Sequence, residues 1–567
     1  MVNSEASSDG SGKPKIVVVG GVAGGASCAA RARRLSEEAE IIIFERGPYV
    51  SFANCGLPYY VGEVITDERH LLVATPETFR RRFNIQVRLH CEVLSIACER
   101  QEIQVKNIES GETWTEKYDA LVLSPGAAPV KPALPGIDSP GIFTLRTIPD
   151  SRQIREWIAE RRASQAVVVG GGFIGLETTE NLVRRGLAVT LIEALPQVMA
   201  PVDPEMAVPI HDHLTSHGVD LRLSDAVSSF EQSQVANRIV VNTRSGQAHS
   251  ADMVLLAIGV RPEVRLAREA GLELGELGGI RVDDRMRTSD PNVWAVGDAV
   301  EVRDFVTGQW SLMPLAGPAN RQGRMAADNI LGREIMFRGV QGTAVCRIFD
   351  LTVAFTGASE KTLGRYGIGG QPAEWEKIYL HPGHHANYYP GARPISMKVI
   401  FSRPDGRILG AQAVGEEGVE KRIDVISMAI QRGSTVLDLE EAELCYAPQF
   451  GTAKDPVNLA GMIAANVLRG DAGIAHSPDV DRSGVFILDV REPAEFEMGH
   501  LENAVNIPLG MLRERMHELP RDKEILVYCA VGQRSYYASR ALRLHGFQAR
   551  NISGGIRTYR AAMRSST

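Results

Sequence analysis

Two stretches of the chain repeat the same succession of a short apolar strand, a glycine-rich loop and a helix. The first runs from the β-branched residues 15–19 into the loop 20–26, and the second from residues 166–169 into the loop 170–175. Glycines in such a loop allow a tight turn and a close approach of the backbone to a pyrophosphate, which lies at the helix N-terminus. The sequence therefore predicts an α/β protein with two dinucleotide-binding units, each built on a parallel sheet.

An acidic residue closes each unit at the end of its next strand. Strand 41–44 ends at Glu45, and strand 188–192 ends at Glu193. A carboxylate at this position accepts hydrogen bonds from a free ribose hydroxyl and repels a 2′-phosphate, so the second unit is predicted to prefer NADH to NADPH. The second loop is a complete G-x-G-x-x-G, whereas Val22 stands at the middle glycine position of the first loop.

Three further strands show how the two units share one chain. Residues 121–126, 254–259 and 292–299 are apolar runs that end in a glycine-containing turn. The last of them returns the chain to the first unit. Two nucleotide folds in one chain predict two bound nucleotides, with the second unit inserted into the domain of the first.

Cys55 lies just beyond Glu45, in the segment 51–59. No second cysteine follows within five residues, and the next one is Cys91. An internal disulfide next to the first nucleotide is therefore not expected. We interpret Cys55 as a single redox thiol that takes its second sulfur from a substrate, although a buried structural cysteine is the common fate of a free thiol.

Composition limits the remaining possibilities. A chain of 567 residues predicts three or four domains, and no apolar run approaches the roughly 18–20 residues of a membrane span. The Ser/Gly-rich residues 1–12 resemble a disordered lead rather than a signal peptide. A net charge of −7 without blocks of like charge gives no support for nucleic acid or membrane as partner. Seven cysteines without a disulfide framework or metal-ligand spacing favour a reducing cytoplasm and no metal.

The two C-terminal blocks are predicted from their own patterns. In the third block, residues 346–355 predict one strand, 397–401 and 408–414 predict a hairpin around a Pro-Asp-Gly turn, and 423–431 predict a helix. In the last block, residues 525–528 predict a strand. A cysteine, a loop and then a helix are predicted to follow it.

That cysteine, Cys529, begins the loop 529–535, which also contains Arg534. A loop at a helix N-terminus aims backbone N–H groups at the sulfur and steadies a persulfide anion, and Arg534 adds a positive charge. The same C-x5-R cradle serves phosphatases. The D-V-R-E run at 489–492 and the G-H-L-E-N-A run at 499–504 favour sulfur transfer.

Taken together, these motifs resemble known families. The S-F-x-N-C-G-L-P segment around Cys55, the Gly-Asp pair at 297–298 and the segments 384–391 and 444–449 are similar to flavoprotein disulfide reductases, and specifically to coenzyme A-disulfide reductase. Residues 480–567 resemble a rhodanese domain. The resemblance implies FAD and NADH as cofactors, with two Rossmann-like domains, an α+β dimerisation domain and a C-terminal α/β rhodanese domain.

The resemblance also implies the domain boundaries. They are a tail at 1–13, an FAD-binding domain at 14–135 and 259–335, an NADH-binding domain at 136–258, a dimerisation domain at 336–469, a linker at 470–479 and the rhodanese domain at 480–567. The cofactor-binding residues implied are Gly20, Val22, Ala23, Gly24, Glu45, Arg46, Ser124, Gly126, Gly170, Gly172, Gly175, Glu193, Gly259, Gly297 and Asp298.

A homodimer with a shared active site is implied as well. One tyrosine from each segment, Tyr388 and Tyr446, would reach the sulfur chemistry of the partner subunit, with Tyr389 as the alternative to Tyr388. Catalytic roles fall to these tyrosines, Cys55, Cys529 and Arg534. Coenzyme A, as substrate or bound carrier, would be bound by Ser27, Arg31, Arg34, Ser51, Asn54 and Lys454. The family's usual lysine falls at or near Phe83, and Arg82 is its expected substitute.

Such a fusion resembles cytoplasmic NADH-dependent persulfide or polysulfide reductases. In the mechanism implied, NADH reduces FAD, the electrons pass to Cys55, and Cys55 attacks a persulfide, a polysulfide or coenzyme A disulfide while Cys529 delivers sulfane sulfur. Three alternatives remain open: plain coenzyme A-disulfide reduction with a separate thiosulfate sulfurtransferase activity, an NADH oxidase or peroxidase, and a non-catalytic redox sensor. Ala23 stands where the oxidases and peroxidases carry a histidine.

Overall fold

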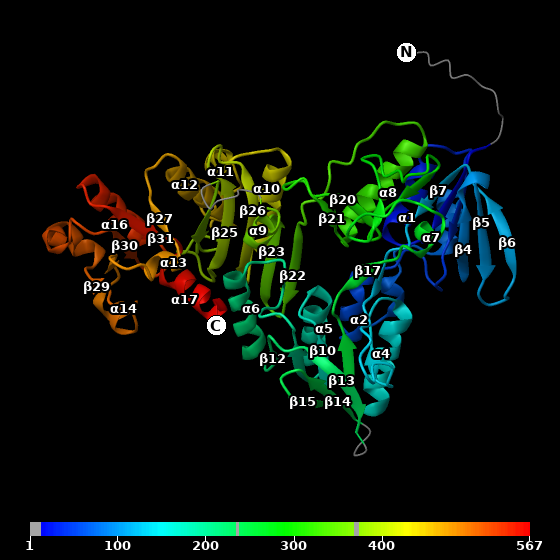
Figure 1. The fold of residues 1–567 in the computed structure, drawn as a ribbon, viewed down its shortest axis with the longest axis horizontal. Coiled ribbons are helices and arrows are strands. Elements are labelled where there is room, and N and C mark those ends of the chain that lie inside the picture. The colour runs from blue at the N-terminus through cyan, green and yellow to red at the C-terminus, as the bar shows by residue number, and fades with distance from the viewer. Residues whose placement is uncertain (1–12, 234–237, 368–373, 567) are drawn as a thin grey trace, which may run out of the picture.

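The structure is a computed structural model that describes residues 13–233, 238–367 and 374–566. The predicted disordered tail, 1–13, lies outside the described residues except for Lys13. The chain runs through four α/β units laid side by side, with the N-terminal unit at one end of an elongated molecule and the C-terminal unit at the other (Figure 1).

The first unit is a parallel sheet of five strands in the order β19-β7-β1-β2-β3. Its elements are β1 (Lys15–Val19), α1 (Ala23–Arg33), β2 (Glu40–Phe44), β3 (Gln86–Arg88), β7 (Ala120–Leu123) and β19 (Val293–Ala295). The central strands are almost entirely buried, as expected for a parallel sheet covered on both faces. Strand β19 pairs with β7 although some 170 residues separate them in sequence, which confirms that the chain returns to its first sheet.

The second unit repeats this arrangement in the order β12-β11-β10-β16-β9. Its elements are β9 (Ile142–Phe143), α4 (Ile148–Arg161), β10 (Gln165–Val169), α5 (Phe173–Arg184), β11 (Ala188–Ile192), α6 (Pro204–Ser216), β12 (Asp220–Arg222) and β16 (Met253–Leu256). Two short antiparallel strands, β8 (Ala127–Pro129) and β17 (Val260–Pro262), carry the chain into and out of this unit. The second unit is therefore an insertion within the first, as predicted.

Smaller sheets, separate from the two parallel sheets, are attached to both units. They are β4 (Cys91–Ala97), β5 (Glu102–Asn107) and β6 (Thr113–Lys117); β13 (Val227–Gln232), β14 (Ile239–Thr243) and β15 (Ala248–Ala251); and β18 (Ile280–Arg281), β20 (Val300–Arg303) and β21 (Trp310–Leu312). The return segment ends in α8 (Ala316–Ile330), which packs along α1.

The third unit is an antiparallel sheet in the order β22-β23-β26-β25-β24. Its elements are β22 (Ala344–Ile348), β23 (Leu351–Gly357), α9 (Glu360–Arg365), β24 (Trp375–Leu380), β25 (Ile395–Ser402), β26 (Ile408–Gly415), α10 (Val419–Gln431), α11 (Val436–Glu441) and α12 (Pro456–Leu468). The hairpin around the Pro-Asp-Gly turn is confirmed. The prediction of one strand over 346–355 is wrong, because Phe349 adopts a φ of 57° and folds the run into the hairpin β22–β23.

The last unit is a parallel sheet in the order β27-β31-β30-β28-β29. Its elements are β27 (Ile474–Ala475), α13 (Ser477–Val480), β28 (Phe486–Asp489), α14 (Pro493–Glu497), β29 (Val505–Asn506), β30 (Ile525–Tyr528), α16 (Gln533–Leu544), β31 (Ala549–Ile552) and α17 (Gly555–Ser566). The segment expected to be a linker, 470–479, is corrected here. Its residues 474–475 form β27, because the edge strand β31 offers backbone groups for pairing.

This last unit is docked against the rest of the chain. Tyr379 donates its backbone N–H to Ser553 Oγ at 2.9 Å, and His381 Nε2 lies 2.8 Å from Thr558 Oγ1. Helix α17 lies beside α6 of the second unit (Figure 1), where Arg564 Nη1 donates to Asp212 at 2.8 Å. The C-terminal unit thus contacts both the second and the third unit.

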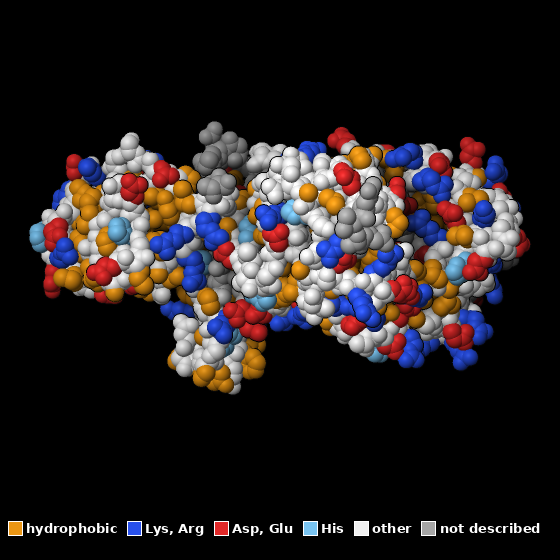
Figure 2. Space-filling model, turned by 90° about the horizontal axis from the view of Figure 1, so that it is seen from below, with side chains coloured by type: hydrophobic (Ala, Val, Ile, Leu, Met, Phe, Trp, Pro, Cys, Tyr) orange, Lys and Arg blue, Asp and Glu red, His pale blue; other side chains and the backbone are white. Residues whose placement is uncertain are grey.

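The surface seen in Figure 2 has Lys, Arg, Asp and Glu side chains interspersed, without a broad region of one sign. In the parts of the chain that the structure describes, no helix combines the length and the apolar character that crossing a membrane would require.

Candidate active site

A single large cavity of about 1750 Å³ joins the first two units. Both glycine loops line it. Of the fifteen cofactor-binding residues predicted from the sequence, all line this cavity except Gly175 and Gly297. Gly175 instead packs against the turn, since a Cβ there would lie 1.9 Å from the carbonyl oxygen of Gly170. Gly297 has a φ of 85° and donates its N–H to Gln322 Oε1 at 2.8 Å.

The two glycine turns have nearly the same geometry. Gly20 and Gly170 end their strands with φ values of 92° and 105°. A Cβ at either position would lie 2.1 Å from the carbonyl oxygen of Ser124 or 2.4 Å from that of Ala257, on the neighbouring strand turn. Only glycine combines such a φ with this close approach. The helices that follow, α1 and α5, therefore begin at the cavity wall and direct their N-terminal N–H groups into it.

The two acids are also equivalent. Glu45 accepts hydrogen bonds from the N–H groups of Gly21 at 2.9 Å and Gly47 at 2.8 Å. Glu193 accepts from Gly171 at 2.6 Å and Leu195 at 2.8 Å. Each carboxylate is thus fixed at the end of its strand, on the cavity wall, where a ribose hydroxyl would be bound.

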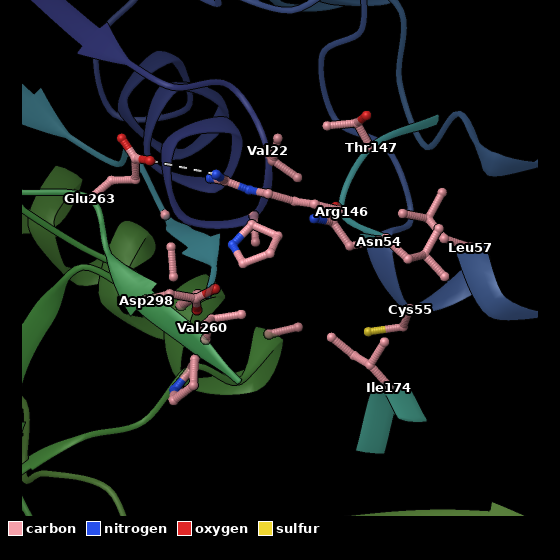
Figure 3. Close-up of a pocket in the computed structure, with 18 of the residues that line it drawn as sticks. Val22, Asn54, Cys55, Leu57, Arg146, Thr147, Ile174, Val260, Glu263 and Asp298 are labelled. Atoms are coloured by element: carbon pink, nitrogen blue, oxygen red, sulfur yellow. Dashed lines mark ion pairs between the residues drawn. The ribbon is translucent and has the colours of Figure 1, made fainter. Parts of the chain in front are cut away.

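Cys55 stands where the two halves of the cavity meet. It lies in a single 3-10 turn (Asn54–Gly56) that continues into α2 (Leu57–Val61). In Figure 3 its sulfur points toward Ile174, which belongs to α5 of the second unit. The side chain is accessible from the cavity, but the walls replace part of its water. This burial, followed by the negative charges of Glu177 and Asp298, raises the pKa of the Cys55 thiol.

The chain's seven cysteines all lie among the described residues, and each is free. Cys91 also lines the cavity, but its side chain is buried.

Sequence reasoning assigned no role to Glu177, which the structure places near Cys55. Glu177 follows Phe173 by one helical turn on α5 and lines the cavity. Tyr59 donates its hydroxyl to Glu177 Oε1 at 3.2 Å. Burial raises the pKa of Glu177 to about 7. The helical spacing from the glycine loop was the one signal for it, since residues one turn apart share a helix face.

Arg146 was also missed. It lies on the cavity wall, where Nη1 is 3.8 Å from Glu263 (Figure 3) and Nη2 donates to the carbonyl oxygen of Pro125 at 3.2 Å. Burial lowers the pKa of its guanidinium. No motif in the sequence marks this position.

The residues predicted to bind coenzyme A divide into two groups. Ser27, Arg34, Ser51 and Asn54 line the cavity together with Cys55. Three others do not line it. Arg31 is held by Asp328 of α8, with Nη2 2.7 Å from Oδ1. Arg82 and Lys454 are exposed, on α3 (Pro76–Phe83) and in the third unit.

The two predicted catalytic tyrosines lie side by side, away from the cavity of their own chain. Their hydroxyl oxygens are 2.6 Å apart, although 58 positions separate Tyr388 from Tyr446. Both are exposed, with 75% and 48% of their surface accessible. Neighbouring Tyr389 packs its ring edge to face against His385 instead. The surface segments 384–391 and 444–449 thus present one joint tyrosine pair to the outside.

Cys529 is completely buried at the end of β30. Gly532 donates its N–H to Cys529 Sγ at 3.2 Å, and Ser535 Oγ lies 3.4 Å from the same sulfur. Arg534 is fixed beside this loop by two hydrogen bonds to Glu495, of 2.6 and 2.7 Å. The predicted cradle of donors around the strand-end sulfur is therefore present.

Comparison with known families identifies these parts. Residues 14–323 match the family model described as pyridine nucleotide-disulphide oxidoreductase, and residues 343–455 match the dimerisation domain of the same family. The chain belongs to the pyridine nucleotide-disulphide oxidoreductase family. Residues 475–562 match the rhodanese-like domain. The predicted fold class is thereby confirmed.

Two solved structures match nearly the whole chain, and a curated relative matches part of it. Reduced CoADR-RHD from Bacillus anthracis shares 48% identity with a TM-score of 0.95, covering 98% of this chain and 99% of that one. An NAD-dependent persulfide reductase from A. fulgidus shares 37% identity with a TM-score of 0.88, covering 96% and 100%. Coenzyme A disulfide reductase from Staphylococcus aureus is 37% identical over 449 residues, which are 79% of this chain and 99% of that protein.

The family uses FAD and NADH, so the predicted cofactors are confirmed. The residues present fit both groups. Each glycine turn leaves the first helical N–H groups open toward the cavity, and a fixed carboxylate stands beside each turn at the ribose position. The arrangement supports a flavoprotein oxidoreductase with the free thiol of Cys55 in its nucleotide cavity.

Proposed function

We propose that this protein is an FAD-dependent, NADH-linked reductase of persulfides, polysulfides or coenzyme A disulfide, which releases sulfide or thiol. The observation that carries the proposal is Cys55, a free thiol at the meeting point of the two nucleotide halves of the cavity. The docked rhodanese-like unit adds a second sulfur-handling site, and one structural relative is described as a persulfide reductase.

The reaction begins at Cys55. Its thiolate attacks one sulfur of the substrate S–S bond, which forms a mixed disulfide and releases the other sulfur as a thiolate that takes up a proton. A flavin bound in this cavity would supply the two electrons, taken from NADH, that reduce the mixed disulfide to the Cys55 thiolate and a second thiolate. Burial, followed by the negative charges of Glu177 and Asp298, raises the pKa of the Cys55 thiol in the chain by itself.

The partner subunit completes the site in this proposal. Tyr388 and Tyr446 share a short hydrogen bond, which raises the pKa of Tyr388 and keeps its proton available. Their exposure and their absence from the cavity of their own chain support a role at a second active site. We assign them to positioning or protonating the leaving sulfur in the partner's cavity.

Coenzyme A enters the proposal as substrate or carrier. Ser27, Arg34, Ser51 and Asn54 surround the cavity next to Cys55, and an exposed guanidinium suits a phosphate. Arg31 would first have to leave Asp328. Arg82 and Lys454 could contact coenzyme A only outside this cavity, with Lys454 supplied across a dimer. The domain boundaries given above, with a homodimer as the working unit, belong to the same proposal.

The Staphylococcus aureus relative, which corresponds to this chain without its last unit, favours plain coenzyme A-disulfide reduction as the second candidate. Steady-state NADH oxidation with coenzyme A disulfide, coenzyme A persulfide, glutathione persulfide and polysulfide in turn, with sulfide measured alongside, separates the two. Sulfide release at rates equal to NADH oxidation supports persulfide reduction. Turnover with coenzyme A disulfide alone would overturn it in favour of the second candidate.

A further inference from the structure

A group of metal-ligand side chains lies outside the active site, where the second unit meets the third. His213 lies on the last turn of α6, His217 caps the same helix four positions later, and Asp350 comes from the turn between β22 and β23. One ligand atom from each lies within 4.8 Å of the other two. We propose that His213, His217 and Asp350 bind a divalent transition metal such as zinc, which clamps α6 to the β22–β23 hairpin.

The His217 ring is already set for ligation. Its Nδ1 lies 2.9 Å from the carbonyl oxygen of His213, which can only accept, so Nδ1 carries the hydrogen and Nε2 carries the lone pair. The ring stacks on Phe349 with centroids 4.0 Å apart and planes 7° apart. A hydrogen bond from one ring nitrogen to a carbonyl is the usual way in which a metal-binding histidine is oriented.

His213 Nε2 supplies an independent observation. The atom is buried, and it forms an ion pair with Asp350 Oδ1 at 2.7 Å. An imidazole nitrogen and a carboxylate from two different units are therefore already in contact, as two ligands of one ion would be.

Asp350 completes the set from a different unit. The left-handed Phe349 turns the chain so that Asp350 follows it directly at the hairpin tip, 2.7 Å from His213 Nε2 and 3.9 Å from His217 Nε2. Zinc bonds of 2.0–2.2 Å in a tetrahedron place ligand atoms about 3.3 Å apart, midway between these two distances. Small side-chain movements therefore suffice to receive the ion.

The charges around the three residues favour the binding of a cation. The negative charge of Glu416, like that of Asp350, acts on His213. A second acidic group in the chain, Asp203, Glu205 and Glu360, has a comparable spacing. There, however, Lys398 Nζ already occupies the centre, 2.7 Å from Asp203 and 2.6 Å from Glu205. Among the described residues, no lysine ammonium forms an ion pair with Asp350.

Three protein ligands leave one position of a tetrahedral ion for water. None of the three residues lines the active-site cavity, so the site is separate from the flavin chemistry. The ion would tie the inserted nucleotide unit to the dimerisation unit, and its effect would be on how firmly these two units stay together. Nitrogen and carboxylate ligands together suit zinc, cobalt or nickel.

Zinc titration of the full-length holoprotein against a colorimetric chelator tests the site. Accessible thiols are first alkylated with iodoacetamide, since cysteines would compete for zinc. The wild type is expected to hold one zinc more than His217→Ala and Asp350→Asn, or to bind it about 100-fold more tightly. Zinc is also expected to raise the Tm of the wild type but not of either variant.

His500→Ala is the matched control. His500 likewise places Nδ1 3.0 Å from a carbonyl oxygen four residues earlier and stacks on Phe496 at 3.8 Å, but it belongs to no ligand cluster among the described residues. This variant should bind zinc as the wild type does. Cobalt should give a visible absorption band beyond the flavin spectrum only where the site is intact. Equal zinc binding by wild type, His217→Ala and Asp350→Asn would overturn the proposal.

Discussion

The two reactive cysteines lie in opposite surroundings. Cys55 faces a wide cavity, and its neighbours are the acids Glu177 and Asp298, which act with burial to raise its pKa. Cys529 is completely buried and receives the N–H of Gly532 at 3.2 Å, with Ser535 Oγ at 3.4 Å. One thiol is open and disfavoured as an anion, whereas the other is enclosed by donors that stabilise negative sulfur.

This difference indicates which groups outside its own loop each cysteine requires. The donors around Cys529 belong to its own loop, so a persulfide anion there requires no cofactor and no partner subunit. In the proposed reaction, Cys55 depends on groups that the chain alone does not supply, namely a bound flavin, a substrate sulfur and the partner's tyrosines. We therefore expect Cys529 chemistry to survive changes that stop Cys55 chemistry, and the reverse.

The largest expected effect is the reciprocal loss at the two cysteines. Cys55→Ser should lower NADH-dependent reduction of every disulfide and persulfide by more than about 10³-fold, because the nucleophile is gone. FAD absorbance and thiosulfate sulfurtransferase activity should remain. Cys529→Ser should show the opposite pattern, and Cys91→Ser, which removes another cavity thiol, should change neither. Sulfide release by Cys55→Ser would remove Cys55 from the centre of the mechanism.

The tyrosines test whether the Cys55 site is shared between subunits. Tyr388→Phe and Tyr446→Phe should each slow NADH-dependent turnover by about 10²-fold if they protonate a leaving thiolate. Sulfurtransferase activity and the dimer, measured by light scattering, should stay intact. Tyr389→Phe is the control, and a loss there without one at Tyr388 would exchange their roles. Mixed dimers carrying Cys55→Ser in one chain and Tyr446→Phe in the other should keep one fully working site if the tyrosine acts across the dimer, and none if it acts within its own chain.

The proposed transfer of sulfane sulfur from Cys529 to Cys55, a relay between the two sites, gives a smaller effect that depends on the substrate. A persulfide on the pantetheine arm of coenzyme A could be held by the residues proposed to bind coenzyme A beside Cys55, whereas a bulky or inorganic sulfane-sulfur donor lacks this anchor. Cys529→Ser should therefore slow turnover with polysulfide by about tenfold and leave coenzyme A persulfide nearly unchanged. NADH oxidation rates with polysulfide, glutathione persulfide and coenzyme A persulfide provide the measurement. Equal losses on all three would rule out a selective relay.

Much of this arrangement could be predicted because its signals are local. Strand, glycine loop, helix and acid follow one another within 30 residues in each nucleotide unit, and the loop around Cys529 spans seven. What failed depends on distant pairs. The Arg31–Asp328 contact joins positions 297 apart, and the Tyr59–Glu177 contact joins positions 118 apart. The left-handed Phe349 likewise shows no pattern in an apolar run, because its φ is set by the sheet that the hairpin enters.

The smallest expected effect concerns the negative charge of Glu177 near Cys55. Glu177 has its pKa raised to about 7 by burial, so it is neutral below that pH and negative above it. Only the negative form repels the Cys55 thiolate. Glu177→Gln should therefore leave the rate of Cys55 alkylation by iodoacetamide unchanged at pH 6. At pH 8 it should raise that rate about two- to fivefold, because the thiolate fraction increases when the repelling charge is removed.

Glu263→Gln is the control for this measurement. Glu263 lines the same cavity but contacts Arg46 and Arg146 instead of acting on Cys55. Its substitution should leave the pH profile of Cys55 alkylation as in the wild type. A Glu177→Gln ratio that stays constant from pH 6 to pH 8 would mean that Glu177 has no part in raising the Cys55 pKa. The contrast with Cys529 would then come from burial and Asp298 at one site and from the loop donors at the other.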